Sequence, residues 1–270
     1  MQQPIAILDS GVGGLTVAKE VMRQLPQEKL IYFGDTARTP YGSRPAQEVG
    51  LFTRQIIDFL MQYKPKMIVI ACNTATAVAL EESKQRLNIP VIGVVHPGAR
   101  AAIKSTRKNV VGVIGTEGTI KSGAYERALK QISPSINVIS LACPTLVPLV
   151  ESGLFKDSQV TATVAEALKP LLSIELDCLI LGCTHYPFLM KPMKAVVGPN
   201  VRLISSADET AREISTILYH RSQLAHTADA PVHQFFSSGD AQKFHDIAVD
   251  WLGEEMKQQT IVWQTAAVGE

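Results

Sequence analysis

Short apolar runs alternate along the chain with longer stretches of helical period. The runs are rich in valine, isoleucine and leucine and nearly continuous, which is typical of parallel strands covered on both faces. They predict buried strands at residues 5–8, 30–33, 67–71, 91–95, 110–114, 138–141, 178–181 and 201–204. Between them, apolar side chains recur on single helical faces, for example Leu15, Ala18, Val21, Met22 and Leu25. The sequence therefore predicts an α/β fold with mainly parallel sheets flanked by helices.

A weak internal repeat links the two halves of the chain. The first predicted strand runs into Asp9 and the third into Cys72, while the fifth leads to Thr116 and the seventh to Cys183. A similar length of chain separates the two residues of each pair. Ligands of open α/β sheets bind beside the carboxyl ends of strands, so two similar domains that face each other would place two thiols across one crevice. A chance match of the spacing is the alternative.

Length and charge narrow the class of protein. The chain of 270 residues is long enough for two ordinary domains, and 26 Lys and Arg against 25 Asp and Glu give a net charge of +1. A chain with this charge balance lacks the excess of basic residues that is typical of a nucleic-acid binder. Polar residues interrupt the longest mostly apolar stretch, at residues 67–80, and the first residues lack the basic start of a signal peptide. We therefore expect a cytoplasmic protein that binds neither nucleic acid nor membrane.

The four cysteines form no CxxC pair and are too few for a disulfide framework. Cys143 and Cys178 are interpreted as small buried residues with free thiols. Cys72 and Cys183 differ, because polar residues follow each of them. Each also lies between a strand and a predicted helix, whose dipole favours a thiolate. His185 lies two residues after Cys183, which is the arrangement that thiol acid–base chemistry requires.

The glycine-rich turn at residues 9–14 is a second candidate for chemistry. It differs from GxGxxG, so it is a weak signal for a dinucleotide. Its backbone N–H groups and the Ser10 hydroxyl, at a helix N-terminus, suit a carboxylate ligand, whereas an ordinary βα turn is the plain interpretation. Asp9 is either the N-cap of that helix or a carboxylate that lies over the site.

Four motifs in order along the chain resemble the glutamate racemases of the aspartate/glutamate racemase family. They are residues 9–17, 35–42, 71–75 and 182–187, and the resemblance extends over essentially the whole chain, including residues 207–211 and 237–240. It implies two similar α/β domains, residues 1–95 with 208–270 and residues 96–207, with the active site in the crevice between them. It also implies interconversion of L- and D-glutamate without a cofactor, supply of D-glutamate for peptidoglycan, and a homodimer.

The resemblance also implies roles for individual residues. Cys72 and Cys183 are the implied acid–base residues, assisted by Asp9 and His185 respectively. The implied substrate contacts are Asp9, Ser10, Tyr41, Gly42, Asn73, Thr74, Thr116, Thr119, Thr184 and His185. Asp35 and Glu151 are accessory residues, and no metal ligand is implied.

The chemistry of inversion makes independent sense of this pattern. Inverting a chiral α-carbon needs a base on one face and an acid on the other, and two thiols supply both. The α-proton is a weak acid, so the thiolate must be basic and dry, and the developing carbanion needs nearby donors. Four alternatives stay open: an aspartate racemase, a hydrolase or decarboxylase that uses one thiol, a non-catalytic amino-acid binding module, and a zinc site of Cys72, Cys183 and His185.

Overall fold

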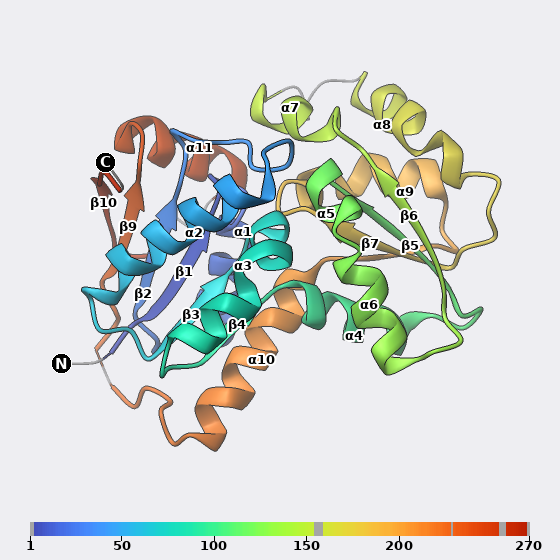
Figure 1. Cartoon of the computed structure of the whole chain (residues 1–270). Helices are drawn as coiled ribbons and strands as arrows, with labels where there is room; N and C mark the ends of the chain where they lie inside the picture. Colours follow the sequence, from blue (N-terminus) through green and yellow to red (C-terminus); the bar gives the residue numbers. More distant parts are fainter. Residues whose placement is uncertain (1–2, 154–158, 228, 254–257, 269–270) are drawn as a thin grey trace. The chain divides into compact units, whose positions relative to one another are not determined.

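Two units make up the protein, whose structure is a computed structural model that describes residues 3–153, 159–227, 229–253 and 258–268. Unit 1 comprises residues 1–94 and 207–270, and unit 2 comprises residues 95–206. Each unit contains one parallel β-sheet with helices packed against it (Figure 1). The predicted α/β class is therefore confirmed.

The sheet of unit 1 has the strand order β10-β9-β2-β1-β3-β4, and every neighbouring pair in it is parallel. Its strands are β1 (Ile5–Asp9), β2 (Leu30–Gly34), β3 (Met67–Ile70), β4 (Val91–Gly93), β9 (His233–Ser237) and β10 (Ile261–Thr265). Its helices are α1 (Leu15–Gln24), α2 (Ala46–Met61), α3 (Asn73–Arg86), α10 (Ser206–His220) and α11 (Ala241–Leu252). Because the strands are parallel, the carboxyl ends of β1, β2 and β3 meet at one edge of this sheet.

Apolar side chains cover both faces of this sheet, as the near-continuous strand runs predict. Leu8, Phe33 and Ile70 lie in one buried cluster with residues of α2 and α3. On the opposite face, the ring of Tyr32 stacks on Phe244 of α11, with 5.9 Å between the ring centroids. The central strands are thus fixed from both sides, which holds the loops at their carboxyl ends in place.

Unit 2 contains a four-stranded sheet with the order β6-β5-β7-β8, again parallel throughout. Its strands are β5 (Val110–Gly115), β6 (Asn137–Ala142), β7 (Cys178–Gly182) and β8 (Arg202–Ile204). Its helices are α4 (Val95–Ser105), α5 (Glu117–Lys121), α6 (Ala124–Ile132), α7 (Leu146–Glu151), α8 (Val160–Leu168), η2 (Lys169–Leu171), η3 (Tyr186–Leu189) and α9 (Met190–Val197). Gly115 lies opposite Gly182 in the register, so β5 and β7 end side by side.

Two features of the sheets differ from the sequence prediction. The strand expected at residues 138–141 exists as β6, but it is not buried, because it is an edge strand with β5 as its one neighbour. Strands β9 and β10 were not predicted. They are as long as β1, but their apolar runs, Phe235-Phe236 in β9 and 261–263 in β10, are shorter than those of the central strands, so the pattern that identifies the central strands does not reveal them.

A buried ion pair fixes the segment after α10 to the sheet of unit 1. Lys66 Nζ lies 2.6 Å from Glu28 Oε2, and the two side chains are 4% and 2% exposed. Lys66 also donates to the carbonyl of Gln223, and Glu28 accepts the backbone N–H of Ala225. We expect Lys66→Met to lower the free energy of unfolding by about 3–5 kcal/mol, because it leaves the Glu28 charge buried without its partner. Urea unfolding measures this loss.

An exposed pair provides the matched control. Lys84 Nζ lies 2.8 Å from Glu81 Oε1, but these side chains are 41% and 72% exposed. Lys84→Met should change the free energy of unfolding by less than about 1 kcal/mol, since solvent already screens this pair. Equal losses in the two variants would show that burial does not set the strength of the Lys66–Glu28 interaction.

Candidate active site

Asp9 ends β1 and is completely buried. Its Oδ2 accepts the backbone N–H of Gly11 at 3.0 Å. Helix α1 begins later, at Leu15, and its N-cap is Gly14, so the interpretation of Asp9 as the N-cap is wrong. A Cβ at Gly14 would lie 2.5 Å from the Cβ of Asp9, so only glycine lets the start of α1 approach this carboxylate. Asp9 is therefore a buried carboxylate at the carboxyl edge of the sheet.

Cys72 lies beside Asp9 at the same edge. The N–H of Ala71 donates to the carbonyl of Leu8, which extends the β1–β3 pairing up to the thiol. Cys72 is the N-cap of α3, and its Sγ accepts the N–H of Ala75 at 3.4 Å. The predicted position between a strand and a helix is confirmed for this cysteine, which is 5% exposed. The helix dipole and the Ala75 N–H both stabilise negative charge on the sulfur.

The polar residues expected around Cys72 lie close to it along the chain. Asn73 and Thr74 form the first turn of α3 and are buried. Ser10 directly follows Asp9 and is also buried. The structure thus brings the hydroxyl and amide groups of these three residues to the sheet edge that carries the thiol.

Tyr32 is a member of this cluster that sequence analysis missed. Its hydroxyl donates to the carbonyl of Gly11 at 2.7 Å and so fixes the turn after Asp9. Burial raises the pKa of Tyr32, and negative charges on Asp9 and Cys72 raise it further, so the phenol stays protonated. Tyr32 stands within an apolar strand run, where a tyrosine resembles any other core residue. The pattern of the sequence therefore carries no signal for it.

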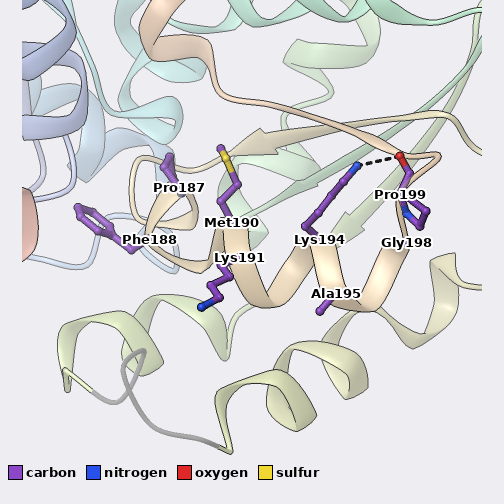
Figure 2. Close-up of a pocket in the computed structure, with 8 residues that line it drawn as sticks. All are labelled: Pro187, Phe188, Met190, Lys191, Lys194, Ala195, Gly198 and Pro199. Carbon is purple, nitrogen blue, oxygen red and sulfur yellow. Dashed lines mark hydrogen bonds between the residues drawn. The ribbon is translucent and has the colours of Figure 1, made fainter.

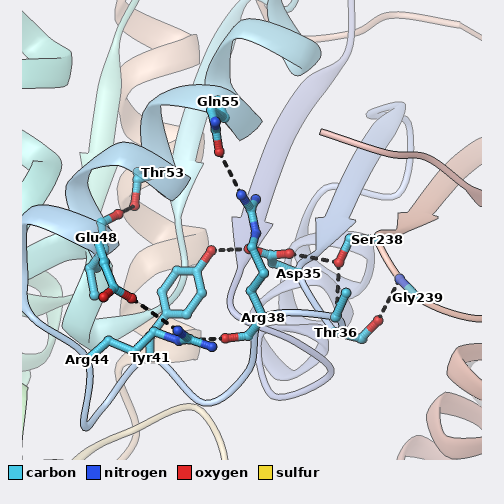
Figure 3. A network of polar contacts seen from close by, with 12 residues as sticks. Asp35, Thr36, Arg38, Tyr41, Arg44, Glu48, Thr53, Gln55, Ser238 and Gly239 are labelled. Carbon is cyan, nitrogen blue, oxygen red and sulfur yellow. Dashed lines mark hydrogen bonds and ion pairs between the residues drawn. The ribbon is translucent and has the colours of Figure 1, made fainter. Parts of the chain in front are cut away.

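Tyr41 lies in the loop after β2, and its hydroxyl points toward Asp35 (Figure 3). Its hydroxyl donates to Oδ2 of Asp35, which also accepts Arg38 Nε at 2.7 Å. Burial raises the pKa of Tyr41, and the Asp35 carboxylate raises it further, with a smaller effect from Cys72. Asp35 is fully buried, so it acts within the protein as the acceptor that orients Tyr41 and, through the chain, Gly42. We call Asp9, Tyr32, Tyr41 and Cys72 the Cys72 cluster.

Unit 2 contains a second thiol, which belongs to a chain of three polar groups. Cys183 Sγ lies 3.8 Å from Nδ1 of His185, and Nε2 of His185 lies 3.2 Å from Oε1 of Glu151. Cys183 and His185 are buried, whereas 32% of the Glu151 side chain is exposed. We call these three residues the Cys183 cluster. The order of a thiol, an imidazole and a carboxylate that orients the imidazole is the general arrangement of an activated nucleophile or base.

The helix dipole acts differently on Cys183 than expected. Cys183 lies between β7 and the short 3₁₀ helix η3, as predicted, but η3 begins only at Tyr186, so this thiol does not cap a helix as Cys72 does. His185 supplies the charge instead. Burial lowers the pKa of His185, but hydrogen bonds and charge interactions with Cys183 and Glu151 outweigh it and raise the pKa to about 10. An imidazolium therefore faces the Cys183 sulfur at neutral pH.

The hydroxyls expected near Cys183 lie at the carboxyl ends of β5 and β7. Thr184 follows Cys183 and is buried. Thr116 is the N-cap of α5, where its Oγ1 accepts the N–H of Thr119 at 3.3 Å and donates to the Thr119 hydroxyl at 3.0 Å. Tyr186, which sequence analysis did not assign to a site, lies near the thiol: burial raises its pKa, and the charge of Cys183 raises it further.

The two remaining cysteines are core residues, as predicted. Cys143 and Cys178 are 2% and 0% exposed, and both thiols are free. Burial raises the pKa of each thiol to about 12, so both stay protonated at neutral pH. They contrast with Cys72, whose sulfur accepts a backbone N–H, and with Cys183, whose sulfur faces an imidazole, because their thiols only donate to backbone carbonyls.

One open hollow of unit 2 contains none of the predicted site residues. Its volume is about 770 Å³, and it is lined by residues of η3, α9 and the turn after α9 (Figure 2). Lys194, one of its two lysines, donates to the carbonyls of Pro199 and Val201. The hollow offers mainly apolar groups and lacks the thiols, so it is not the candidate site.

Groups of metal-ligating side chains and membrane-spanning helices are both absent from the part of the chain that the structure describes. Among these residues, no group of three or more His, Cys, Asp and Glu side chains could hold a metal ion. The zinc alternative thus gains nothing from them. No helix in the same residues is long and apolar enough to cross a membrane.

Comparisons with known proteins agree with this geometry. Residues 14–214 match the model of the Asp/Glu/hydantoin racemase family. The glutamate racemase of Exiguobacterium sibiricum is 53% identical over 98% of this chain and 98% of its own length. The crystal structure of a Bacillus anthracis glutamate racemase isoform superposes with a TM-score of 0.92 at 49% identity, covering 99% of this chain and 97% of that one. The Francisella tularensis glutamate racemase in complex with D-glutamate gives 0.87 at 34% identity, covering 97% of each chain.

The two α/β units, each with a cysteine at the carboxyl end of a strand, thus define the protein as an amino-acid racemase. The chain belongs to the Asp/Glu/hydantoin racemase family, and the three relatives named above are all glutamate racemases. The family resemblance found in the sequence motifs is confirmed.

Proposed function

We propose that this enzyme interconverts L- and D-glutamate without a cofactor, with Cys72 and Cys183 as its two acid–base residues. One observation carries the proposal: each unit holds a buried thiol at the carboxyl end of a parallel strand, next to a hydrogen-bonding partner, the Ala75 N–H for Cys72 and the His185 imidazole for Cys183. Glutamate is favoured over aspartate because the relatives that are 34–53% identical to this chain are glutamate racemases. A hydrolase or decarboxylase would need only one of the two clusters.

The reaction is a proton transfer across the α-carbon. The thiolate of one cysteine takes the α-proton, and the electron pair stays on the α-carbon and its carboxylate as a carbanion. The thiol of the other cysteine then donates its proton to the opposite face, which yields the enantiomer and a new thiolate. The two thiols end with their protonation states exchanged, so the product state is ready for the reverse reaction.

The surrounding groups adjust this chemistry in two different ways. In the Cys72 cluster, the Ala75 N–H stabilises the thiolate, and the buried carboxylate of Asp9 assists proton transfer. In the Cys183 cluster, the imidazolium of His185 stabilises the thiolate, and Glu151 orients the imidazole. The two directions of reaction therefore depend on different helpers.

Polar side chains, together with the backbone of Gly42, are proposed to bind the two carboxylates and the ammonium group of glutamate. They are Asp9, Ser10, Tyr41, Gly42, Asn73, Thr74, Thr116, Thr119, Thr184 and His185. Hydroxyl and amide donors can hold the carboxylates and stabilise the developing charge without an arginine among the proposed binding residues. The proposal extends to a cytoplasmic homodimer that supplies D-glutamate for peptidoglycan.

Isotope labelling in deuterated water tests the proposal. Enzyme that has equilibrated in D₂O is mixed with protonated L- or D-glutamate, and α-deuterium in substrate and product is followed by ¹H NMR. We expect the product to carry deuterium from the first turnover, because the donating thiol has exchanged with solvent, while early recovered substrate keeps its proton. Product that retains the original proton, or substrate that exchanges as fast as it inverts, would show that a single base serves both faces.

A further inference from the structure

The segment after β9 contacts the loop that carries Tyr41, although about two hundred residues separate them in sequence (Figure 3). The N–H of Ser238 donates to the carbonyl of Gly34 at 3.1 Å. Its hydroxyl donates to Oδ1 of Asp35 at 2.7 Å and accepts the N–H of Ala37 at 3.0 Å. One serine thus makes hydrogen bonds to three residues, the last residue of β2 and two residues of the loop after it.

The neighbours of Ser238 hold the same loop through a second set of contacts. The hydroxyls of Ser237 and Thr36 lie 2.6 Å apart, and the N–H of Gly239 donates to the Thr36 hydroxyl at 3.0 Å. A Cβ at Gly239 would lie 2.7 Å from the Thr36 oxygen, so the approach requires glycine. The segment of residues 237–239 is therefore fitted closely to the loop.

Asp35 transmits this contact to Tyr41. Its two carboxylate oxygens have different partners: Oδ1 accepts the Ser238 hydroxyl, whereas Oδ2 accepts the Tyr41 hydroxyl and Arg38 Nε. The carboxylate is planar and fully buried, so a change at one oxygen rotates the other. Hydrogen bonds to a buried charge are among the stronger ones, and this makes the coupling firm.

We propose that Ser238 is a positioning residue for racemisation, through which the C-terminal segment sets the place of Tyr41 and Gly42. The inference rests on the proposed function, in which Tyr41 and Gly42 bind glutamate. Ser238 acts through Asp35 and does not touch the substrate itself. Its effect therefore falls on binding of both enantiomers and not on one of the two thiols.

Steady-state kinetics of Ser238→Ala test this role. We expect KM for L- and D-glutamate to rise about tenfold while kcat stays within about threefold, because one hydrogen bond to a buried charge is lost. Ser238→Thr keeps the hydroxyl and should restore KM. Thr36→Val, which removes the adjacent contact, should raise KM in the same way and replaces Ser238→Ala if that variant does not fold.

Ser105→Ala is the matched control. Ser105 is partly buried like Ser238, but its hydroxyl donates only to the Ala101 carbonyl of its own helix. We expect its KM to stay at the wild-type value. Values of KM for Ser238→Ala and Thr36→Val within twofold of this control would overturn the inference.

A measurement without substrate separates this inference from the proposed function. Protein labelled with ¹³C-tyrosine gives a Tyr41 ring signal, which Tyr41→Phe identifies. Ser238→Ala should shift this signal and Ser238→Thr should return it, even if the wild-type enzyme failed to racemise glutamate and so refuted the proposed function. An unchanged Tyr41 signal in Ser238→Ala would show that the serine does not position Tyr41.

Discussion

Replacement of Cys72 by alanine is expected to lower glutamate racemisation by about 10⁴-fold, and replacement of Cys183 by alanine should do the same. Inversion needs a proton donor on one face of the α-carbon and an acceptor on the other, so either loss stops the full reaction. Circular dichroism of L- and D-glutamate measures the rate. In D₂O, each variant should still exchange the α-proton of one enantiomer, the one whose proton the remaining thiol reaches.

Cys143→Ala and Cys178→Ala are the controls for this experiment. Both cysteines are buried and free like the other two, but their thiols donate to the backbone carbonyls of Ala167 and Ala102 and lie outside the Cys72 and Cys183 clusters. We expect racemisation near the wild-type rate in both. Near-normal racemisation in Cys72→Ala or in Cys183→Ala would refute the two-thiol mechanism and favour a hydrolase or decarboxylase with one essential thiol.

Loss of the imidazole at position 185 is expected to have the next largest effect. His185→Asn should lower kcat by about 10²–10³-fold in the direction that uses Cys183 as the base, because no cation then stabilises that thiolate. The equilibrium constant between enantiomers is unity, so kcat/KM must fall equally in both directions. The difference between the two directions is therefore expected in kcat and in the α-deuterium isotope effect, each measured separately for L- and D-glutamate.

The dependence on pH follows from the charge of His185. With a pKa of about 10, His185 is protonated at neutral pH, and its stabilising charge is lost as the pH rises through about 10. Glu151→Gln removes one of the two groups that raise this pKa, so the fall in kcat at high pH should move to lower pH. An unchanged pH profile in Glu151→Gln would mean that Glu151 does not act on His185.

An exposed pair of the same type controls for a general effect of charge removal. His245 Nδ1 lies 3.0 Å from Asp246 Oδ1 on the surface of unit 1. Asp246→Asn should leave kcat and its pH profile unchanged.

The central strands of both sheets could be predicted from the sequence, because their near-continuous apolar runs arise directly from burial on two faces. The edges of the sheets could not. β6 has the composition of a buried strand, yet one neighbour leaves it partly exposed. β10 pairs only with β9, and its sequence does not distinguish it from a loop.

The residues of the candidate site also include some that the sequence could predict and some that it could not. Cys72 stood out because a polar turn follows an apolar strand, and this local signal correctly predicts its position between a strand and a helix. Tyr32 and Ser238 gave no such signal, since their roles depend on partners that only the fold brings near. His185 could be assigned to Cys183 because the two residues are close in sequence. The contact between Glu151 and His185 could not be predicted in this way, because it depends on how α7 packs against His185.

The cap that Cys72 provides for α3 has a consequence for how this position would evolve. Serine, threonine, aspartate and asparagine are the residues that cap helices best, so the fold would be served at least as well by any of them. Selection for stability alone would not keep a thiol here. A duplicated copy freed from catalysis would drift to serine or aspartate at position 72 while its fold persisted. A retained cysteine would therefore mark a copy that still racemises.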